Sequence, residues 1–176
     1  MVFRMIFGDL YLVMKALFYW HVHFHFISLF SGKIDKDHRS KIVLSKKDNI
    51  MNGTVLTAHA GGTIKIGSGV YIGRNSMIVS HSSIEIGSGT NIGMNVVILD
   101  HDHDYKKQTG GLLCSDVKIG KNVWIGASAI ILRGTVIGDN SVVAAGSLIK
   151  GTYPADSLIM NKRGTTVTVI SQPDAQ

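Results

Sequence analysis

The stretch Ile119-Gly120-Lys121-Asn122-Val123-Trp124-Ile125-Gly126 decides the fold, because its six-residue pattern recurs along most of the chain. In each repeat an aliphatic residue is followed by a turn and then by a small or β-branched residue. From Ile66 onward, the aliphatic position of twelve repeats is occupied by Ile66, Ile72, Ile78, Ile86, Ile92, Ile98, Ile119, Ile125, Ile131, Ile137, Val143 and Ile149. A six-residue period excludes an α-helix, whose apolar stripe returns every 3.6 residues.

The turn position, three residues after each aliphatic residue, favours residues that adopt positive φ at low cost. It is occupied by Gly69, Asn75, His81, Gly89, Asn95, His101, Asn122, Ser128, Gly134, Asn140, Gly146 and Thr152. The next position is small or β-branched in ten of the twelve repeats, which requires a narrow interior. The pattern predicts triangular coils of about eighteen residues, stacked about 4.8 Å apart as in a parallel sheet. Coils are expected to start at Ile64, Ile84 and Val117.

Length and composition bound the class of protein. The 176 residues suit one domain, and the single cysteine, Cys114, excludes an intrachain disulfide, so we expect a cytoplasmic protein. The net charge of +6 would suit nucleic acid, an anionic membrane or a phosphate-bearing cofactor. The basic residues are scattered and no familiar nucleic-acid motif is present, so no nucleic-acid partner is expected.

The first forty residues form a separate apolar segment. The longest apolar run, from Ala16 to Phe30, is shorter than the ~20 residues that a membrane helix needs, and no signal-peptide cleavage site follows it. We expect a docking helix or an interfacial segment that touches a membrane surface. Within it, His21, His23 and His25 alternate with other residues, so they could bind a metal; a half-exposed strand or amphipathic helix is the favoured alternative.

Over residues 50 to 153 these repeats resemble the hexapeptide-repeat acyltransferases. The resemblance implies an all-β, left-handed parallel β-helix, a homotrimer with active sites between subunits, and acetyl-CoA as acyl donor. Handedness depends on the resemblance, because the general rule for parallel crossovers favours the right-handed form. We expect an N-terminal segment (1–40), a catalytic β-helix (41–153) with a protruding loop (101–116), and a C-terminal tail (154–176) with a short strand near residues 165 to 170.

The repeat is interrupted between Ile98 and Ile119, where a loop opens with Asp100-His101-Asp102-His103-Asp104. Acetyl transfer to a hydroxyl needs a base for the alcohol proton, and the proton affinity of histidine suits that task. In the sugar O-acetyltransferases of the family the base is a histidine at the start of such a loop, a place matched by His101, with His103 second. The alternative for His101 is a corner residue with positive φ. Asp100 or its neighbouring aspartates either orient the imidazole or are solvated.

Other site residues are implied by the same resemblance. Asn75 would help to bind the acceptor, although an ordinary left-handed corner explains it nearly as well. Trp124 would line the acyl-transfer site, together with His103 and Asp100, or else pack on the next subunit. The backbone N–H of Ala127 would stabilise the oxyanion. CoA would contact the main chain at Ala145 and Gly146, and its phosphates would meet cations, for which the candidates are Lys150, Lys162 and Arg163; solvated surface charge is the alternative for all three.

The expected function is acetyl-CoA-dependent O-acetylation of a sugar or surface polysaccharide, in a ternary complex and without a metal. The acceptor, and whether the acyl group is acetyl or another short acyl, stay open. One alternative is a zinc enzyme like the γ-class carbonic anhydrases, although His81, His101 and His103 lack the expected spacing; another is a non-catalytic β-helix scaffold. Residues 1 to 40 lack the N-terminal segment of the maltose and galactoside acetyltransferases. Met160-Asn161-Lys162-Arg163-Gly164 replaces a usual Gly-x-Pro segment, which leaves the adenine end of CoA unassigned.

Overall fold

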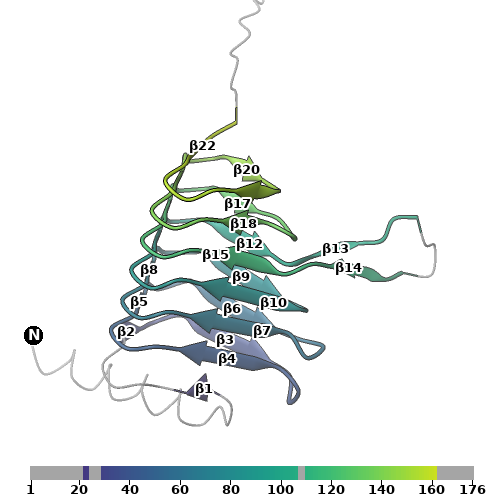
Figure 1. Ribbon diagram of the computed structural model, residues 1–176. Helices are drawn as coiled ribbons and strands as arrows, with labels where there is room; N and C mark the ends of the chain where they lie inside the picture. The colour runs from purple at the N-terminus through teal and green to yellow at the C-terminus, as the bar shows by residue number, and fades with distance from the viewer. Residues whose placement is uncertain (1–21, 24–28, 107–109, 162–176) are drawn as a thin grey trace, which may run out of the picture.

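The computed structural model describes residues 22–23, 29–106 and 110–161, which form a left-handed parallel β-helix with three flat faces (Figure 1). Each face is one parallel sheet, named A, B and C in the order in which the chain passes through them. The N-terminal segment before residue 22, the histidines at 21 and 25, and the strand expected near residues 165 to 170 lie outside the described residues.

The strands are short and recur once per coil. Sheet A contains β1 (Val22–His23), β4 (Lys41–Leu44), β7 (Thr63–Ile66), β10 (Ser83–Ile86), β15 (Val117–Ile119), β18 (Val136–Ile137) and β21 (Thr152–Tyr153). Sheet B contains β2 (Leu29–Phe30), β5 (Asn49–Ile50), β8 (Tyr71–Ile72), β11 (Asn91–Ile92), β16 (Trp124–Ile125), β19 (Val142–Val143) and β22 (Leu158–Ile159). Sheet C contains β3 (Lys33–Lys36), β6 (Val55–Ala58), β9 (Met77–Ser80), β12 (Val97–Leu99), β17 (Ile130–Ile131) and β20 (Leu148–Ile149).

The predicted coil starts are confirmed, because Ile64, Ile84 and Val117 lie side by side in sheet A. The uniform eighteen-residue coil is wrong for the early coils. Thr63 lies opposite Lys41, 22 residues earlier, whereas Val136 lies opposite Lys118 at the expected spacing. The early coils are longer because their strands in sheets A and C have four residues. Pairing of β3 with β6 also places coil structure upstream of residue 41.

The corners carry the turn chemistry that the repeat predicts. We call them the AB, BC and CA corners after the sheets they join. Nine of the twelve predicted turn residues have positive φ, for example Asn75 at 58° and Gly146 at 61°. The three exceptions are His81 and His101, at the CA corner, and Thr152, which opens strand β21 of sheet A. His101 is therefore not the positive-φ corner residue of the alternative interpretation; it opens strand β13.

The interior is a narrow column of aliphatic side chains. Ile72, Ile92 and Ile125, which are neighbours in sheet B, are fully buried. The small residues of the repeat satisfy the backbone between coils: the Ser76 hydroxyl donates to the Gly93 carbonyl at 3.0 Å, and the Thr90 hydroxyl donates to the Gly120 carbonyl at 2.9 Å. A larger side chain at these positions would have no room in the column.

The protruding loop is more regular than the sequence predicted. It is an antiparallel hairpin of β13 (His101–His103) and β14 (Leu112–Cys114), which extends away from the prism (Figure 1). Residues 107–109 at its tip are not described. Within the described ranges, no helix has the length and apolar character needed to cross a membrane.

Candidate active site

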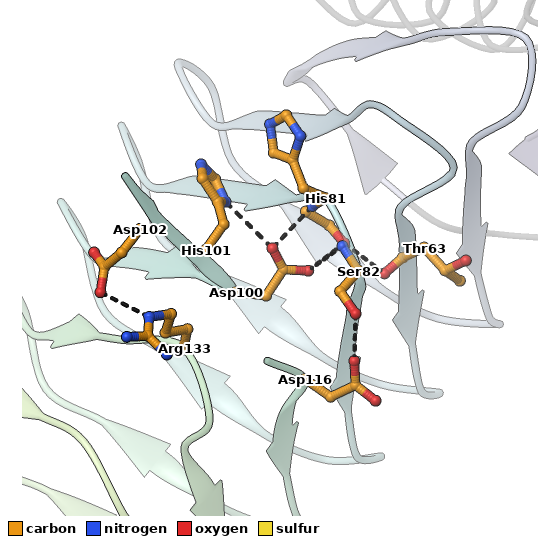
Figure 2. A network of polar contacts seen from close by, with 9 residues as sticks. Thr63, His81, Ser82, Asp100, His101, Asp102, Asp116 and Arg133 are labelled. Atoms are coloured by element: carbon orange, nitrogen blue, oxygen red, sulfur yellow. Dashed lines mark hydrogen bonds and ion pairs between the residues drawn. The ribbon is translucent and has the colours of Figure 1, made fainter. Parts of the chain in front are cut away.

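Asp100 organises the CA corner directly after β12. It is fully buried, so its charge needs compensation by hydrogen bonds. The carboxylate accepts four, from the Ser80 hydroxyl at 2.7 Å, the His81 N–H at 2.8 Å, the Ser82 N–H at 2.9 Å and His101 Nδ1 at 3.2 Å (Figure 2). One side chain therefore closes the corner and orients the first residue of the hairpin, as the sequence allowed for Asp100.

The contact with Asp100 determines which ring nitrogen of His101 is available for chemistry. A carboxylate has only acceptor sites, so Nδ1 of His101 carries the proton in this contact. The other nitrogen, Nε2, then has the free lone pair that a general base requires. The side chain of His101 keeps 15% of its surface exposed, which leaves room for an acceptor hydroxyl to approach.

His81, which the sequence offered as a turn residue or a zinc ligand, stands next to His101. The two ring centroids are 4.3 Å apart, and the His59 ring follows at 6.3 Å from His81. Burial, followed by the charge of His101, lowers the pKa of His81. Nδ1 of His81 is buried and has no hydrogen-bond partner among the described residues. The signal in the sequence was the spacing of the three histidines, one coil apart.

The hairpin is fastened to the prism by its acidic residues. Arg133 Nε donates to Asp102 at 2.9 Å, and the Ser82 hydroxyl donates to Asp116 at 2.6 Å (Figure 2). His103 is exposed and lies opposite Leu112, on the same side of β13 as His101 because side chains alternate along a strand. In the parts of the chain that are described, no three His, Cys, Asp or Glu side chains gather closely enough to hold a metal ion.

A groove of about 510 Å³ lies on the face of sheet B and along the BC corner. The residues that line it are Tyr71, Gly73, Arg74, Gly93, Met94, Trp124, Gly126, Ala127, Val142, Val143, Ala144 and Ala145. The predicted Trp124, Ala127 and Ala145 thus come together here, and Trp124 is 63% exposed. Among the described residues, no acceptor takes the Ala127 N–H, so this donor is open to a ligand.

The remaining predicted residues lie around or away from this groove. Asn75 occupies a positive-φ turn at the BC corner, so its structural interpretation is correct, and its role toward an acceptor stays a prediction. The Gly146 N–H donates to the Ala127 carbonyl at 2.7 Å, so this hydrogen bond already occupies the N–H that was predicted to contact CoA. Lys150 follows β20 at the CA corner, across sheet C from the groove of the same chain. Lys162 and Arg163 lie outside the described residues.

The two halves of the site lie at opposite edges of sheet C. His101 follows β12 at the CA corner, whereas Ala127 precedes β17 at the BC corner, and β12 and β17 are paired neighbours. The chain crosses the whole sheet between Ala127 and Arg133, a span of roughly 15–20 Å at about 3.3 Å per residue. A single chain therefore does not bring the imidazole to the Ala127 amide.

Comparisons with known proteins agree with the fold. Residues 63–100 match the hexapeptide repeat of succinyl-transferase, and residues 116–151 match the bacterial transferase hexapeptide (six repeats). The Saccharomyces cerevisiae protein named "Putative acetyltransferase YJL218W" is 30% identical over 148 residues, which cover 80% of this chain and 76% of that protein. Galactoside O-acetyltransferase of Escherichia coli K12 is 40% identical over 52 residues, which cover 30% of this chain and only 26% of that protein.

A solved structure gives the same result. A galactoside acetyltransferase in complex with coenzyme A is 34% identical, with a TM-score of 0.51 over 53% of this chain and 48% of that one. The repeats, the stacked coils and the relative that aligns over most of both chains all point to one group of proteins. The chain belongs to the hexapeptide-repeat acyltransferase family.

Proposed function

We propose that the protein is an acetyl-CoA-dependent O-acetyltransferase that modifies a sugar hydroxyl and works as a homotrimer. The observation that carries the proposal is the contact between the His101 imidazole and buried Asp100. Asp100 holds Nδ1 of the ring at 3.2 Å, which leaves Nε2 to accept a proton. A fixed, partly exposed imidazole at the base of a protruding hairpin fits a general base better than a structural role.

The reaction follows from the two halves of the site. His101 Nε2 takes the proton of the acceptor hydroxyl as its oxygen attacks the thioester carbonyl of acetyl-CoA. The Ala127 N–H stabilises the negative charge on the carbonyl oxygen, because a preorganised donor is most effective where charge develops. His101 then returns its proton to the departing CoA sulfur, so the products are the acetyl ester and the free thiol. Transfer is direct, and protein groups supply each of these steps.

The separation of the two halves supports a trimer. Since His101 and Ala127 lie at opposite edges of sheet C, a site that contains both needs the CA corner of one subunit against the BC corner of another. The outer face of sheet C suits such contact, because Met77, Ile130 and Leu148 leave 41%, 38% and 53% of their surfaces exposed. Exposed apolar side chains that gather on one face mark protein contacts.

A sugar acceptor is supported by the aromatic wall of the groove. Tyr71 and Trp124 project from the same face of sheet B, two coils apart, with Asn91 of the intervening coil between them. Aromatic faces offer large, rigid contact area to the apolar faces of a sugar ring. The relative and the solved structure named for galactoside acetylation agree with this choice of acceptor.

The test is release of free thiol from acetyl-CoA in the presence of sugars and their amino analogues, with sedimentation to measure the oligomer. We expect acceptor-dependent release by a trimer with hydroxyl acceptors. Transfer to the amino analogues alone would correct the acceptor atom, and absence of release with every acceptor would contradict the proposal. Zinc-dependent hydration of carbon dioxide without acetyl transfer would support the anhydrase alternative instead.

A further inference from the structure

Among the described residues that line the groove on sheet B, Arg74 is the only charged one. It is exposed, and its guanidinium forms no ion pair or hydrogen bond with any residue that the structure describes. The other lining residues are small, aliphatic or aromatic. No other charged side chain in the lining of the groove therefore competes with Arg74 for an anion that enters it.

The coil register places Arg74 relative to the point of acyl transfer. Arg74, Met94, Ala127 and Ala145 occupy the same corner position in four successive coils, because the preceding strands β8, β11, β16 and β19 pair in that order. Hydrogen bonds along the corner confirm the stacking: Asn95 N–H donates to the Arg74 carbonyl, and Ser128 N–H donates to the Met94 carbonyl, both at 2.9 Å. Arg74 is thus two coils before Ala127, about 10 Å away along the prism.

This position favours the acceptor over the donor as the partner of Arg74. In the proposed function CoA lies toward the later coils, on the side of Ala145. Arg74 lies on the opposite side of Ala127, in the coil of Tyr71, and both Tyr71 and Trp124, which is two coils farther along, line the same groove. A ligand whose ring rests on those aromatics would bring a substituent within reach of the guanidinium.

We propose that Arg74 selects an acceptor with a negatively charged group, a carboxylate or a phosphate on the sugar. Guanidinium pairs with both groups through two parallel N–H···O bonds, which add orientation as well as affinity. The acid group would anchor the ring, so that one particular hydroxyl reaches His101 of the adjoining subunit. This inference rests on the proposed function and adds the chemical class of its acceptor.

The test compares matched acceptors that differ only in charge: glucose, glucuronate, glucuronate methyl ester and glucose 6-phosphate, with the same series for galactose and one acidic oligosaccharide. We expect an acid to exceed its neutral counterpart by about tenfold or more in kcat/KM. Arg74→Gln should remove this preference, mainly through KM of the acid, and leave KM of acetyl-CoA unchanged. Arg74→Lys should retain part of it. Lys118→Gln removes the same charge from the outer face of sheet A and should change nothing.

Direct binding of the same compounds, measured by calorimetry without acetyl-CoA, separates this inference from the proposed function. Binding of an acid that Arg74→Gln weakens about tenfold or more would support the role of Arg74 even if no acetyl transfer occurs. An unchanged preference in Arg74→Gln, or an increase in KM of acetyl-CoA alone, would overturn the inference while leaving the acetyltransferase intact. So would failure of every acid in the series to bind the parent protein.

Discussion

The Asp100 carboxylate holds Nδ1 of His101 at 3.2 Å and at the same time caps the turn that follows β9. Each oxygen of the carboxylate accepts two hydrogen bonds: Oδ1 from His101 and the His81 N–H, and Oδ2 from the Ser80 hydroxyl and the Ser82 N–H. Catalytic geometry and local stability therefore depend on one buried side chain.

Asp100→Asn should reduce both the catalytic rate and the stability of the folded protein. The amide has one acceptor oxygen in place of two and directs an NH₂ group at existing donors, so His101 loses its tautomer control; we expect kcat to fall roughly 10²-fold or more. Loss of charge-assisted bonds should lower the unfolding free energy by about 2–4 kcal/mol. Steady-state kinetics and denaturant unfolding measure the two effects. Asp116→Asn is the control, since exposed Asp116 accepts a single bond from Ser82 at the same corner; equal losses in the two variants would contradict this assignment.

The contact between the two rings predicts that the pKa of His81 depends on His101. Burial is the main cause of the lowered pKa of His81, and the charge of His101 is the second. In His101→Gln the pKa of His81 should rise, because the neighbouring charge that lowers it is removed. NMR titration of the His81 ring protons measures this shift. His59→Gln should have a smaller effect on the pKa of His81, because the His59 ring is farther from His81 than the His101 ring is. The same pKa of His81 in the parent and in His101→Gln would show that the rings do not interact in solution.

Asp48 predicts a pH dependence of stability that is separate from the site. It is 1% exposed, and burial raises its pKa from 3.8 to about 6. Between these values the folded protein keeps a proton that the unfolded chain releases, so the unfolding free energy should fall by about 2–3 kcal/mol as pH rises from 4 to above 6. Asp48→Asn keeps the acceptor for the Val70 N–H and should remove this contribution. The unfolding free energies of the parent and of Asp48→Asn, measured between pH 4 and pH 7, test this contribution. The same pH dependence in both proteins would contradict it.

Much of this structure follows from sequence because the hexapeptide repeat is local. The aliphatic position of each repeat is buried, and Gly or Asn at the turn position takes positive φ at all eight of its sites. The early CA corners depart from the pattern, as at His81, because longer strands in sheets A and C lengthen the early coils. That lengthening brings His59, His81 and His101 into one column, which the expected coil length did not reveal. The hairpin was also missed, since its pairing joins residues across an irregular segment.

The corner position of Arg74 could be predicted from the sequence. It stands two residues after an aliphatic position, as Ala127 does, so the repeat alone aligns them at one corner. What the sequence did not supply was the absence of a partner for its guanidinium among the described residues, which depends on side-chain placement. The same register argument separates His101 from Ala127, because it assigns them to different corners.

A site shared between subunits predicts complementation in mixed trimers. His101→Ala removes the base, and Gly126→Ala places a Cβ against the backbone of Ala145, which displaces the Ala127 amide. Each variant should be inactive alone, and co-expression should restore up to about a quarter of the parent activity, since random mixing pairs an intact His101 with an intact Ala127 at that frequency. Gly111→Ala, whose Cβ would meet only open space and the Asp104 Cβ at 4.0 Å, is the control for glycine replacement. Trimers without recovered activity would place the whole site in one chain.

The most direct measurement compares His101→Ala with His59→Ala for acceptor-dependent thiol release from acetyl-CoA. Both variants remove an imidazole from the same column at the CA corner, but only His101 has its ring held by Asp100. We predict that the rate of His101→Ala is roughly 10²–10⁴-fold below that of the parent, whereas His59→Ala retains most of the parent rate. Equal rates for the parent and His101→Ala would remove His101 from the mechanism.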